Sequence, residues 1–354
     1  VLVTKPPYRV PSMREIAALP WNGFKVASTF SGCGGSCLGY RMAGYRVVYA
    51  NEFIPEAQRT YKENHPNSYL DGSDIRSLTP EMLLERAGVQ RGELDLFDGS
   101  PPCSAFSTAG KREEGWGKVK AYSDGAQRVD DLFYEYARIL EGVQPKVFVA
   151  ENVSGLVKGT AKGYFKRILQ ALRDCGYNVK CRVLDARWLG VPQMRQRTIF
   201  VGVRNDLGLE PVHPKPFPYA YNVGDCLTPP PSDTTAKELN RESETYRFWS
   251  QSKPGETLGD ACKRITGKNS FLTHCKQSPS RPANTITQGT QQLYHWDEPR
   301  TLTLGELRRV GGFPDDFALT GSFQQQWERI GRAVPPLMMA QVAKTIEQEI
   351  LSKL

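Results

Sequence analysis

The feature that most constrains the fold is the alternation of short apolar segments with helical ones along residues 25–204. Segments typical of buried strands lie at residues 25–30, 45–50, 94–97, 146–150, 178–184 and 198–203, and another short strand ends within 71–75. Helices are expected at residues 36–42, 54–64, 80–87, 131–141 and 164–175. Strands that alternate with helices form a parallel sheet covered on both faces. The sequence therefore predicts an α/β fold with a mostly parallel central sheet.

The pattern changes after Arg204. A proline-rich stretch with little periodicity follows, which indicates a linker. Short, irregular apolar runs come next, and residues 262–281 hold five Lys or Arg residues and no Asp or Glu. Order returns near residue 303, and residues 337–354 predict a closing helix. We therefore expect three parts, with the bounds 1–204, 205–300 and 301–354.

Composition excludes several classes of protein. The 354 residues include 39% hydrophobic ones, enough for a sizeable core, and no apolar run is long enough to span a membrane. The eight cysteines form no CxxC pair and only four histidines are present, so we expect neither a metal site nor a disulfide framework. A reducing compartment is therefore favoured. The formal charge of +8 is compatible with a polyanionic partner.

A candidate nucleophile ends the sequence Asp95-Leu-Phe-Asp-Gly-Ser-Pro-Pro-Cys103. The apolar start of this stretch predicts a short buried strand, and Pro101 and Pro102 stop the strand and stiffen the turn after it. Cys103 would then be held at a rigid strand end, ahead of a polar, glycine-rich segment at 104–130. The arrangement favours a presented thiol, and a buried core cysteine is the alternative.

A glycine-rich turn follows the first expected strand, with the sequence Phe30-Ser-Gly-Cys-Gly-Gly35. Glycines let the backbone approach a ligand, and the N-terminus of the next helix favours a negative group. Glu52, after the second strand, is placed to hold two ribose hydroxyls. Because the turn lacks the GxGxxG pattern, we expect a nucleoside with a carboxylate tail. Asp74 could accept a hydrogen bond from a purine amine, although such a residue alone is more often a turn former, and a surface acid is the alternative for Glu52.

A candidate acid and a pair of arginines follow two later strands. Glu151 comes after an apolar strand, so we expect it at a carboxyl end of the sheet, where it could donate a proton. A helix N-terminal carboxylate is its alternative role. Arg195 and Arg197, at positions i and i+2 of an expected strand, are predicted to point to the same side. A solvated sheet edge is the alternative for this pair.

The short segments discussed above follow one another in the order of the motifs of the cytosine-C5 methyltransferase family, and the chain resembles that family over nearly its whole length. The matching segments are Phe30 to Gly35, Asn51-Glu52, Asp74-Ile75, Pro102-Cys103, Leu132, Glu151-Asn152-Val153, Gln193 to Arg197, Arg281 to Thr287 and Gly331 to Pro335. The sequence departs from the family pattern at Ser28-Thr29, Ser104 and Arg332.

The resemblance implies a Rossmann-like S-adenosylmethionine-dependent methyltransferase fold, with a small irregular target-recognition domain within residues 205–300. Residues 1–204 would hold the catalytic and cofactor sites, and residues 301–354 would return to them. S-adenosylmethionine, released as S-adenosylhomocysteine, would be bound by Phe30, Ser31, Gly32, Cys33, Gly34, Gly35, Glu52, Phe53, Asp74, Ile75, Pro102, Leu132, Ala333 and Val334.

The resemblance also implies a reaction. Cys103 would attack C6 of a cytosine flipped out of duplex DNA, and Glu151 would act near N3. Asn152 would position neighbouring backbone, while Arg195 and Arg197 would hold the base oxygen and the surroundings of Cys103. The 104–130 segment would close over the base. Double-stranded DNA would be contacted by Ser107, Lys111, Arg112, Lys263, Arg264 and Lys268, the last three with plain solvation as the alternative.

The implied protein is a bacterial, cytoplasmic monomer that associates with the nucleoid through DNA, and any cognate restriction endonuclease would act separately. A tRNA cytosine-C5 methyltransferase is one alternative. The paired Pro101-Pro102 before Cys103 resembles the sequence of that branch of the family, whereas the basic stretch at 262–281 favours DNA. A catalytically inactive DNA-binding relative is another, and the intact Cys103 and Glu151 argue against it. A Rossmann dehydrogenase is disfavoured by the missing GxGxxG.

Overall fold

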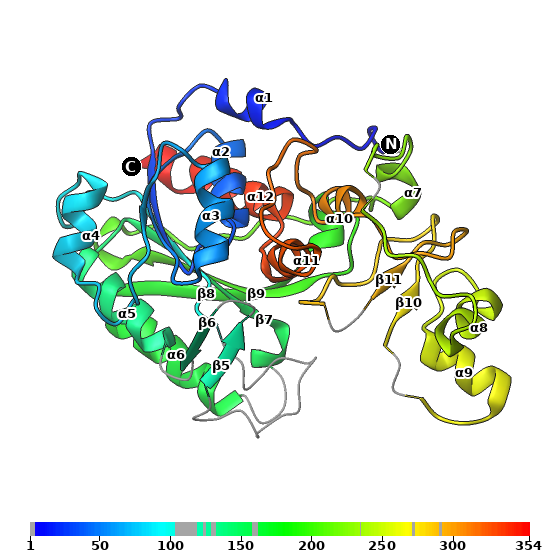
Figure 1. Cartoon of the computed structure of the whole chain (residues 1–354). Coiled ribbons are helices and arrows are strands. Elements are labelled where there is room, and N and C mark those ends of the chain that lie inside the picture. The colour runs from blue at the N-terminus through cyan, green and yellow to red at the C-terminus, as the bar shows by residue number, and fades with distance from the viewer. Residues whose placement is uncertain are drawn as a thin grey trace. The chain divides into compact units, whose positions relative to one another are not determined.

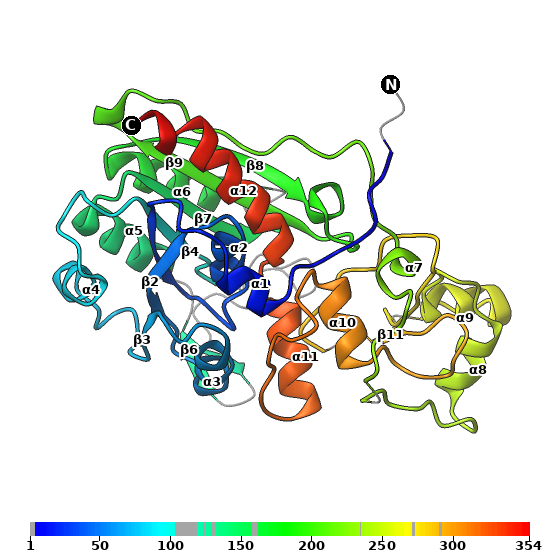
Figure 2. The same ribbon diagram turned by 90° about the horizontal axis from the view of Figure 1, so that it is seen from above.

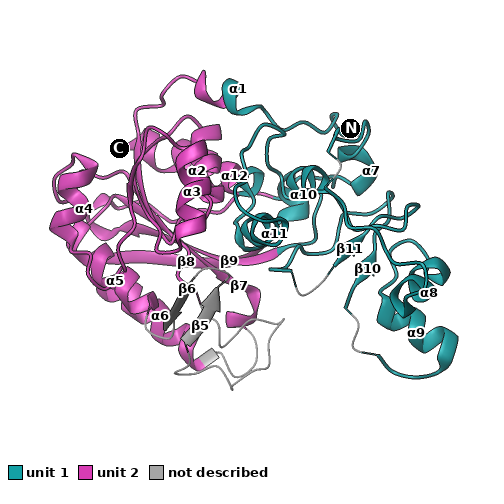
Figure 3. Ribbon diagram, in the orientation of Figure 1, with its two compact units in different colours: residues 1–15, 186–195, 216–338 teal, residues 16–185, 196–215, 339–354 magenta. Residues whose placement is uncertain are grey.

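The computed structural model describes residues 4–102, 119–122, 125–128, 132–157, 162–233, 235–270, 273–289 and 292–354 (Figure 1). The chain divides into two compact units (Figure 3). Unit 1 comprises residues 1–15, 186–195 and 216–338, and unit 2 comprises residues 16–185, 196–215 and 339–354. The expected division at residues 204 and 300 stays a prediction, because it concerns which part recognises the substrate.

Unit 2 contains the central sheet and most of the expected elements. Its strands are β1 (Lys25–Thr29), β2 (Arg46–Asn51), β3 (Tyr69–Asp71), β4 (Leu96–Gly99), β7 (Val147–Val153), β8 (Tyr177–Asp185) and β9 (Gln196–Arg204), and a separate antiparallel pair is formed by β5 (Val119–Tyr122) and β6 (Gly125–Arg128). Its helices are α2 (Gly35–Met42), α3 (Pro55–Asn64), α4 (Pro80–Ala87), α5 (Leu132–Val143) and α6 (Lys162–Asp174). Two further helices, α1 (Met13–Ala17) and α12 (Pro336–Glu349), each contain a unit boundary.

The seven strands follow the order β3-β2-β1-β4-β7-β9-β8, and all neighbours are parallel except at β9. The predicted α/β fold with a mostly parallel sheet is thus confirmed. β9 runs antiparallel to both β7 and β8. Residues 186–195 join β8 to β9 without a long crossover helix, and a parallel partner would need such a crossover.

Helices cover both faces of the sheet in unit 2. In two views, α2, α3 and α12 lie on one face and α4, α5 and α6 on the other (Figures 1 and 2). Successive residues of a strand point to opposite faces. On β4, therefore, Phe97 packs toward α5 and its neighbour Asp98 faces α2, where it contacts Tyr40.

Helix bounds follow local chemistry, as α4 illustrates. The Thr79 side chain accepts a hydrogen bond from Met82 N at its start, and Pro80 occupies the first turn, where no amide donor is needed. Gly88 ends the helix with φ of 63°, in the left-handed region that glycine adopts without strain.

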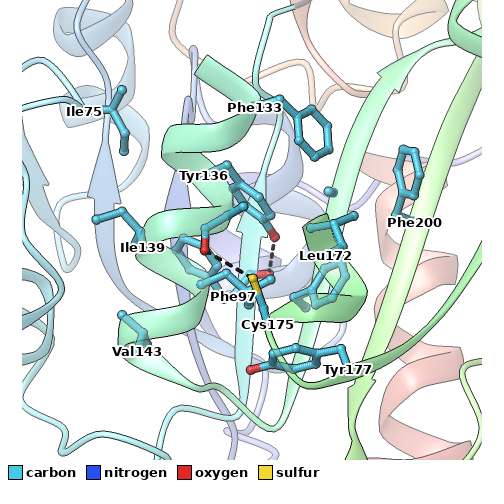
Figure 4. Close-up of a cluster of buried hydrophobic side chains, with 14 of the residues drawn as sticks. Ile75, Phe97, Phe133, Tyr136, Ile139, Val143, Leu172, Cys175, Tyr177 and Phe200 are labelled. Carbon is cyan, nitrogen blue, oxygen red and sulfur yellow. Dashed lines mark hydrogen bonds between the residues drawn. The ribbon is translucent and has the colours of Figure 1, made fainter. Parts of the chain in front are cut away.

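A large core lies between the sheet and α4, α5 and α6 (Figure 4). Phe97 and Tyr136 stack with ring centroids 4.9 Å apart, and Phe148 packs edge-on against Tyr177 at 5.1 Å. Tyr136 donates its hydroxyl to the Val149 carbonyl over 3.1 Å, so its polar tip is satisfied inside the core. Burial of each such ring stabilises the fold by about 1.5–3 kcal/mol, which holds the strand ends of this sheet in place.

Unit 1 contains α7 (Val223–Cys226), α8 (Glu244–Gln251), α9 (Leu258–Thr266), β10 (Cys275–Lys276), β11 (Leu293–Tyr294), α10 (Leu304–Val310) and α11 (Phe323–Arg332). The sequence pattern did not predict α7, α8 or α9. Ser243 and Thr257 cap α8 and α9 by accepting hydrogen bonds from backbone amides. These two helices share a small core of Phe248, Trp249, Leu258, Cys262 and Tyr294, too few apolar residues to produce a long periodic signal.

Among the described residues, every helix is too short or too polar to cross a bilayer.

Replacement of Gly202 by alanine should destabilise unit 2. A Cβ at this position of β9 would lie 2.0 Å from a ring atom of Phe148, which is fully buried. Overpacking of this kind costs about 1–3 kcal/mol. Urea denaturation followed by circular dichroism would measure the loss. The matched control is Gly163→Ala on α6, where an added Cβ meets nothing within 4 Å, so its unfolding free energy should be unchanged or slightly higher. Equal losses in both variants would contradict the packing argument.

Candidate functional site

The candidate site lies where adjacent parallel strands of unit 2 end. Thr29 of β1 pairs with Asn51 of β2 and with Gly99 of β4, and Gly99 pairs with Ala150 of β7. The residues after these positions therefore leave the sheet at one edge, where open α/β sheets bind ligands. The register brings together the glycine turn, Glu52, the Pro101-Pro102 segment and Glu151. The predicted residues Cys103, Ser107, Lys111 and Arg112 lie outside the described residues.

The glycine turn adopts backbone conformations that favour glycine. Gly32 and Gly34 have φ of 57° and 88°, and Phe30 also has positive φ, 54°. A Cβ on Gly34 would lie 2.2 Å from His65 Nε2, so the His65 side chain leaves no space for a larger residue at this position. Added to Gly32, in contrast, a Cβ meets nothing within 4 Å, so the turn is open on that side. Cys33, between them, is buried.

Glu52 is bound to the glycine turn. Its Oε2 accepts a hydrogen bond from Gly32 N and its Oε1 accepts one from Ile54 N, each over 2.7 Å. Backbone amides thus fix a carboxylate beside the open side of the turn, and each of its oxygens has a second lone pair. Such an arrangement fits a ligand that carries hydroxyl groups, as a ribose does.

The other predicted cofactor residues occupy varied settings. Asp74 lies three residues beyond β3, accepts a hydrogen bond from Arg76 N over 3.0 Å and pairs with the Arg76 side chain. Its turn-forming role is therefore visible, and its contact with a purine stays a prediction. Ile75 and Leu132 are buried in the large core, while Phe53 and Pro102 are partly exposed. Ala333 and Val334 follow α11 in unit 1.

Asn152 holds the segment that leads to Cys103. This residue of β7 is 3% exposed, and its Nδ2 donates to the Pro101 carbonyl over 3.1 Å. Its Oδ1 accepts from Val153 N over 2.8 Å, which fixes the orientation of the amide. The backbone two residues before Cys103 is therefore anchored to the strand that carries Glu151.

Glu151 pairs with Arg197 across the antiparallel β7–β9 ladder. The Nε of Arg197 lies 2.7 Å from Oε1 of Glu151, and the two side chains are 15% and 11% exposed. Burial lowers the pKa of Arg197 from its ordinary value, and the negative charge of Glu151 opposes that shift. The pair therefore holds a carboxyl in a fixed orientation at the edge of the sheet, as an acid–base group requires.

Arg195 precedes the strand that carries Arg197, so the expectation that both lie in one strand was wrong. The rule that residues i and i+2 share a side applies only within a strand, and β9 begins at Gln196. Arg195, 1% exposed, donates from Nη1 to the Ile286 carbonyl and from Nη2 to the Gly331 carbonyl, each over 2.9 Å. All three residues belong to unit 1, so Arg195 joins distant segments of that unit.

The basic residues predicted to contact DNA differ in their partners. Lys263 and Lys268 are exposed at the end of α9 and just beyond it. Arg264 instead donates to both carboxylate oxygens of Glu256, over 3.0 and 2.9 Å, and to the Gln251 carbonyl. Arg332, at the position that departs from the family pattern, pairs with Glu328 over 2.7 Å.

One buried carboxyl was not singled out from the sequence. Asp98, on β4, is 1% exposed and accepts hydrogen bonds from Ser28 Oγ and Tyr40 Oη over 2.9 and 3.0 Å. The available signal was an acidic residue directly after the apolar pair Leu96-Phe97, where a buried strand is expected. Within the described ranges, no group of three or more His, Cys, Asp or Glu side chains could hold a metal ion.

Loss of Arg197 should destabilise the fold through Glu151. Removing one partner of a buried ion pair costs about 3–5 kcal/mol, because the other charge is left without its counterion. Arg197→Met should therefore lose more stability alone than in a Glu151→Gln background, with a coupling free energy of about 1 kcal/mol or more. Urea denaturation of the four proteins in the cycle measures this coupling.

The matched control for that cycle is Glu349–Lys353, an exposed i,i+4 pair. Its coupling should not exceed about 0.5 kcal/mol. Additive losses for Arg197 and Glu151 would show that the two side chains do not stabilise each other.

Comparison with known proteins agrees with this geometry. The C-5 cytosine-specific DNA methylase family matches residues 24–348. The Type II methyltransferase M1.HphI of Haemophilus parahaemolyticus is 31% identical over 329 residues, which cover 90% of this chain and 85% of that protein. The Type II methyltransferase M.NgoFVII of Neisseria gonorrhoeae is 32% identical over 340 residues, which cover 91% and 86%.

The fold is also similar to solved structures. A prophage-encoded protein of E. coli, described as a DNA modification methyltransferase, superposes with a TM-score of 0.73 at 20% identity, over 93% of this chain and 100% of that one. This likeness concerns the fold, whereas the family match and the two relatives concern the sequence itself. The chain therefore belongs to the C-5 cytosine-specific DNA methylase family and is a DNA (cytosine-5-)-methyltransferase.

Proposed function

We propose that this chain methylates cytosine in duplex DNA through a covalent bond between Cys103 and the base. The observation that carries the proposal is the ion pair between Glu151 and Arg197. Glu151 lies on β7, the strand that also anchors the Pro101 carbonyl through Asn152. Nothing in the packing of a sheet requires this set of polar contacts at a strand end, whereas covalent catalysis requires a thiol and an acid held in register.

The methyltransferase family implies the use of S-adenosylmethionine, which supplies an electrophilic methyl group when bound. The residues proposed to hold it are those of the glycine turn, Glu52 and Phe53, Asp74 and Ile75, Pro102, Leu132, Ala333 and Val334. Glu52 would bind the ribose hydroxyls with the oxygens that already accept from Gly32 and Ile54. The open side of Gly32 leaves space for the ligand.

Each protein group has one task in the proposed reaction. The thiolate of Cys103 adds to C6 of the cytosine, which makes C5 nucleophilic. Glu151 supplies a proton or a hydrogen bond at N3, and Arg197 fixes the orientation of the Glu151 carboxyl. After C5 has gained the methyl group, it loses its proton to a base, and the sulfur of Cys103 leaves C6 to restore the aromatic ring. The target atoms are inaccessible in a stacked duplex, so the cytosine must be flipped out.

The proposed partner is double-stranded DNA, bound by a monomer that needs no restriction endonuclease for its own reaction. Recognition of the target is assigned to residues 205–280, where Lys263 and Lys268 are exposed. Arg264 would have to leave Glu256 to reach DNA, so its contribution is proposed to be smaller. The relatives compared above are named Type II methyltransferases, which favours DNA over tRNA as the substrate. In a bacterium the enzyme would work in the cytoplasm, at the nucleoid.

The variant Cys103→Ser should retain less than about one-thousandth of the methyl-transfer rate, because the hydroxyl is a far weaker nucleophile than the thiolate. Glu151→Gln should slow transfer by about 10²–10⁴-fold with little change in cofactor affinity. Single-turnover transfer of a labelled methyl group to duplex DNA measures both effects. The control is Cys181→Ser on β8, a partly exposed cysteine outside the proposed site, which should retain the normal rate. Full activity of Cys103→Ser would refute the covalent mechanism, and transfer to tRNA but not to DNA would refute the substrate.

Exchange of residues 205–280 for the corresponding segment of a relative should change the sequence that is methylated, while the chemistry at C5 stays the same. The segment contains the exposed Lys263 and Lys268, whereas Glu151, Asn152 and Arg197 lie outside it. Bisulfite sequencing of DNA from cells that express each chimera identifies the methylated sites. An unchanged target sequence would place recognition elsewhere in the chain.

A further inference from the structure

Asp98 lies between two parts of the proposed site, the segment that leads to Cys103 and the glycine turn. It is on β4, whose chain continues through Pro101 and Pro102 to Cys103. Its register partner on β1 is Ser28, which donates its hydroxyl to Asp98 Oδ2 over 2.9 Å. On the same face of the sheet, the hydroxyl of Tyr40 on α2 donates to Oδ1 over 3.0 Å. Both carboxylate oxygens are therefore used as acceptors.

The hydrogen bonds continue from Asp98 into the glycine turn. Ser31 Oγ donates to Ser28 Oγ over 3.1 Å and to the Ser28 carbonyl over 3.3 Å. Because the single hydroxyl proton of Ser28 is directed to Asp98, its oxygen accepts from Ser31. Ser31 precedes Gly32, whose amide is bound by Glu52. A continuous path thus runs from the strand that leads to the nucleophile to the turn that would hold the cofactor.

We propose that Asp98 is a positioning residue of the cofactor site, whose carboxylate sets the direction of the hydrogen bonds through Ser28 to Ser31. As an acceptor on both oxygens, the carboxylate makes Ser28 an acceptor toward Ser31, so that the Ser31 hydroxyl points back to the sheet. A protonated Asp98 would donate to Ser28, and Ser28 would then donate to Ser31. The protonation state of one buried group would thereby decide whether Ser31 is a donor or an acceptor toward the Ser28 hydroxyl. This inference rests on the cofactor use proposed above.

Burial makes this reversal accessible near neutral pH. Burial raises the pKa of Asp98 to about 7, with the charge of Glu151 adding to the shift, although the hydrogen bonds from Ser28 and Tyr40 oppose it. The titratable groups that interact electrostatically with Asp98 are Cys37 and Tyr40 on α2, Tyr136 on α5 and Glu151 on β7. Burial raises the pKa of the first three far above neutral, and the charge of Glu151 is matched by Arg197.

Isothermal titration calorimetry with S-adenosylmethionine and S-adenosylhomocysteine, between pH 6 and pH 8.5, tests the proposal. At pH 6 a carboxyl with a pKa of about 7 is about nine-tenths protonated, so the wild-type affinity for both ligands should be about three- to tenfold weaker than at pH 8.5. In Asp98→Asn the amide mimics the protonated carboxyl, so binding should be weak and independent of pH. Ser28→Ala, which cuts the path, should also remove the pH dependence.

The stability of the same variants separates positioning from a structural role. Because the pKa of Asp98 is raised by folding, its ionisation weakens the fold as the pH rises through the range from about 4 to about 7. At pH 8 or higher the wild type carries this full penalty and the neutral amide does not, so Asp98→Asn should melt at the same or a higher temperature than the wild type, even though it binds the cofactor more weakly. A residue needed only for structure would lower both the melting temperature and the affinity.

The matched control is Asp95→Asn, three residues earlier on the same chain segment, where the carboxylate binds Lys25 N and Lys146 Nζ instead. It should keep the wild-type pH profile. The proposal would be overturned by a flat wild-type profile, by a pH dependence that persists in Asp98→Asn, or by an effect on S-adenosylmethionine alone, which would indicate direct attraction of the sulfonium. Failure of the wild type to bind either ligand at any pH would overturn the cofactor site itself, and this inference with it.

Discussion

The candidate site depends on the register of four parallel strands. Pairing of Thr29 with Asn51 and Gly99, and of Gly99 with Ala150, makes β1, β2, β4 and β7 end at one edge. A slip of one residue would turn every side chain to the opposite face of the sheet. Phe97 would then leave the aromatic core and Asp98 would enter it, so the packing of α5 and α6 opposes such a slip. The apolar core thus determines where the polar groups of the site lie.

Sequence reasoning located these strands well because each is a short apolar segment between turn residues. The strands β1, β2, β4 and β7 and the helices between them lie where the apolar pattern predicted them. It could not predict that β9 lies between β7 and β8, because periodicity carries no information on strand order. It also did not predict α8 and α9, whose apolar faces are only a few residues long.

Side-chain roles were harder to predict than positions, because a role depends on partners far away in the chain. Arg195 and Arg197 are two residues apart, yet one binds the carbonyls of Ile286 and Gly331 and the other binds Glu151. Arg264 belongs to the stretch 262–281, which contains no acidic residue, but its side chain pairs with Glu256, which precedes that stretch. The role of Asp98 was not predicted because its hydrogen-bond partners are distant in the sequence. Ser28 lies 70 residues away from it and Tyr40 lies 58 residues away.

The connection between β8 and β9 has a consequence for any attempt to divide the molecule. Residues 186–195 leave the sheet, join unit 1 and return to the next strand of the same sheet, while unit 1 also includes residues 1–15 and 216–338. Neither unit is one continuous piece of chain, so a single cut cannot release either of them whole. A ribosome must therefore have synthesised the chain through residue 338 before unit 1 can be complete, and a gene fusion that adds this unit to another scaffold would need at least three insertions.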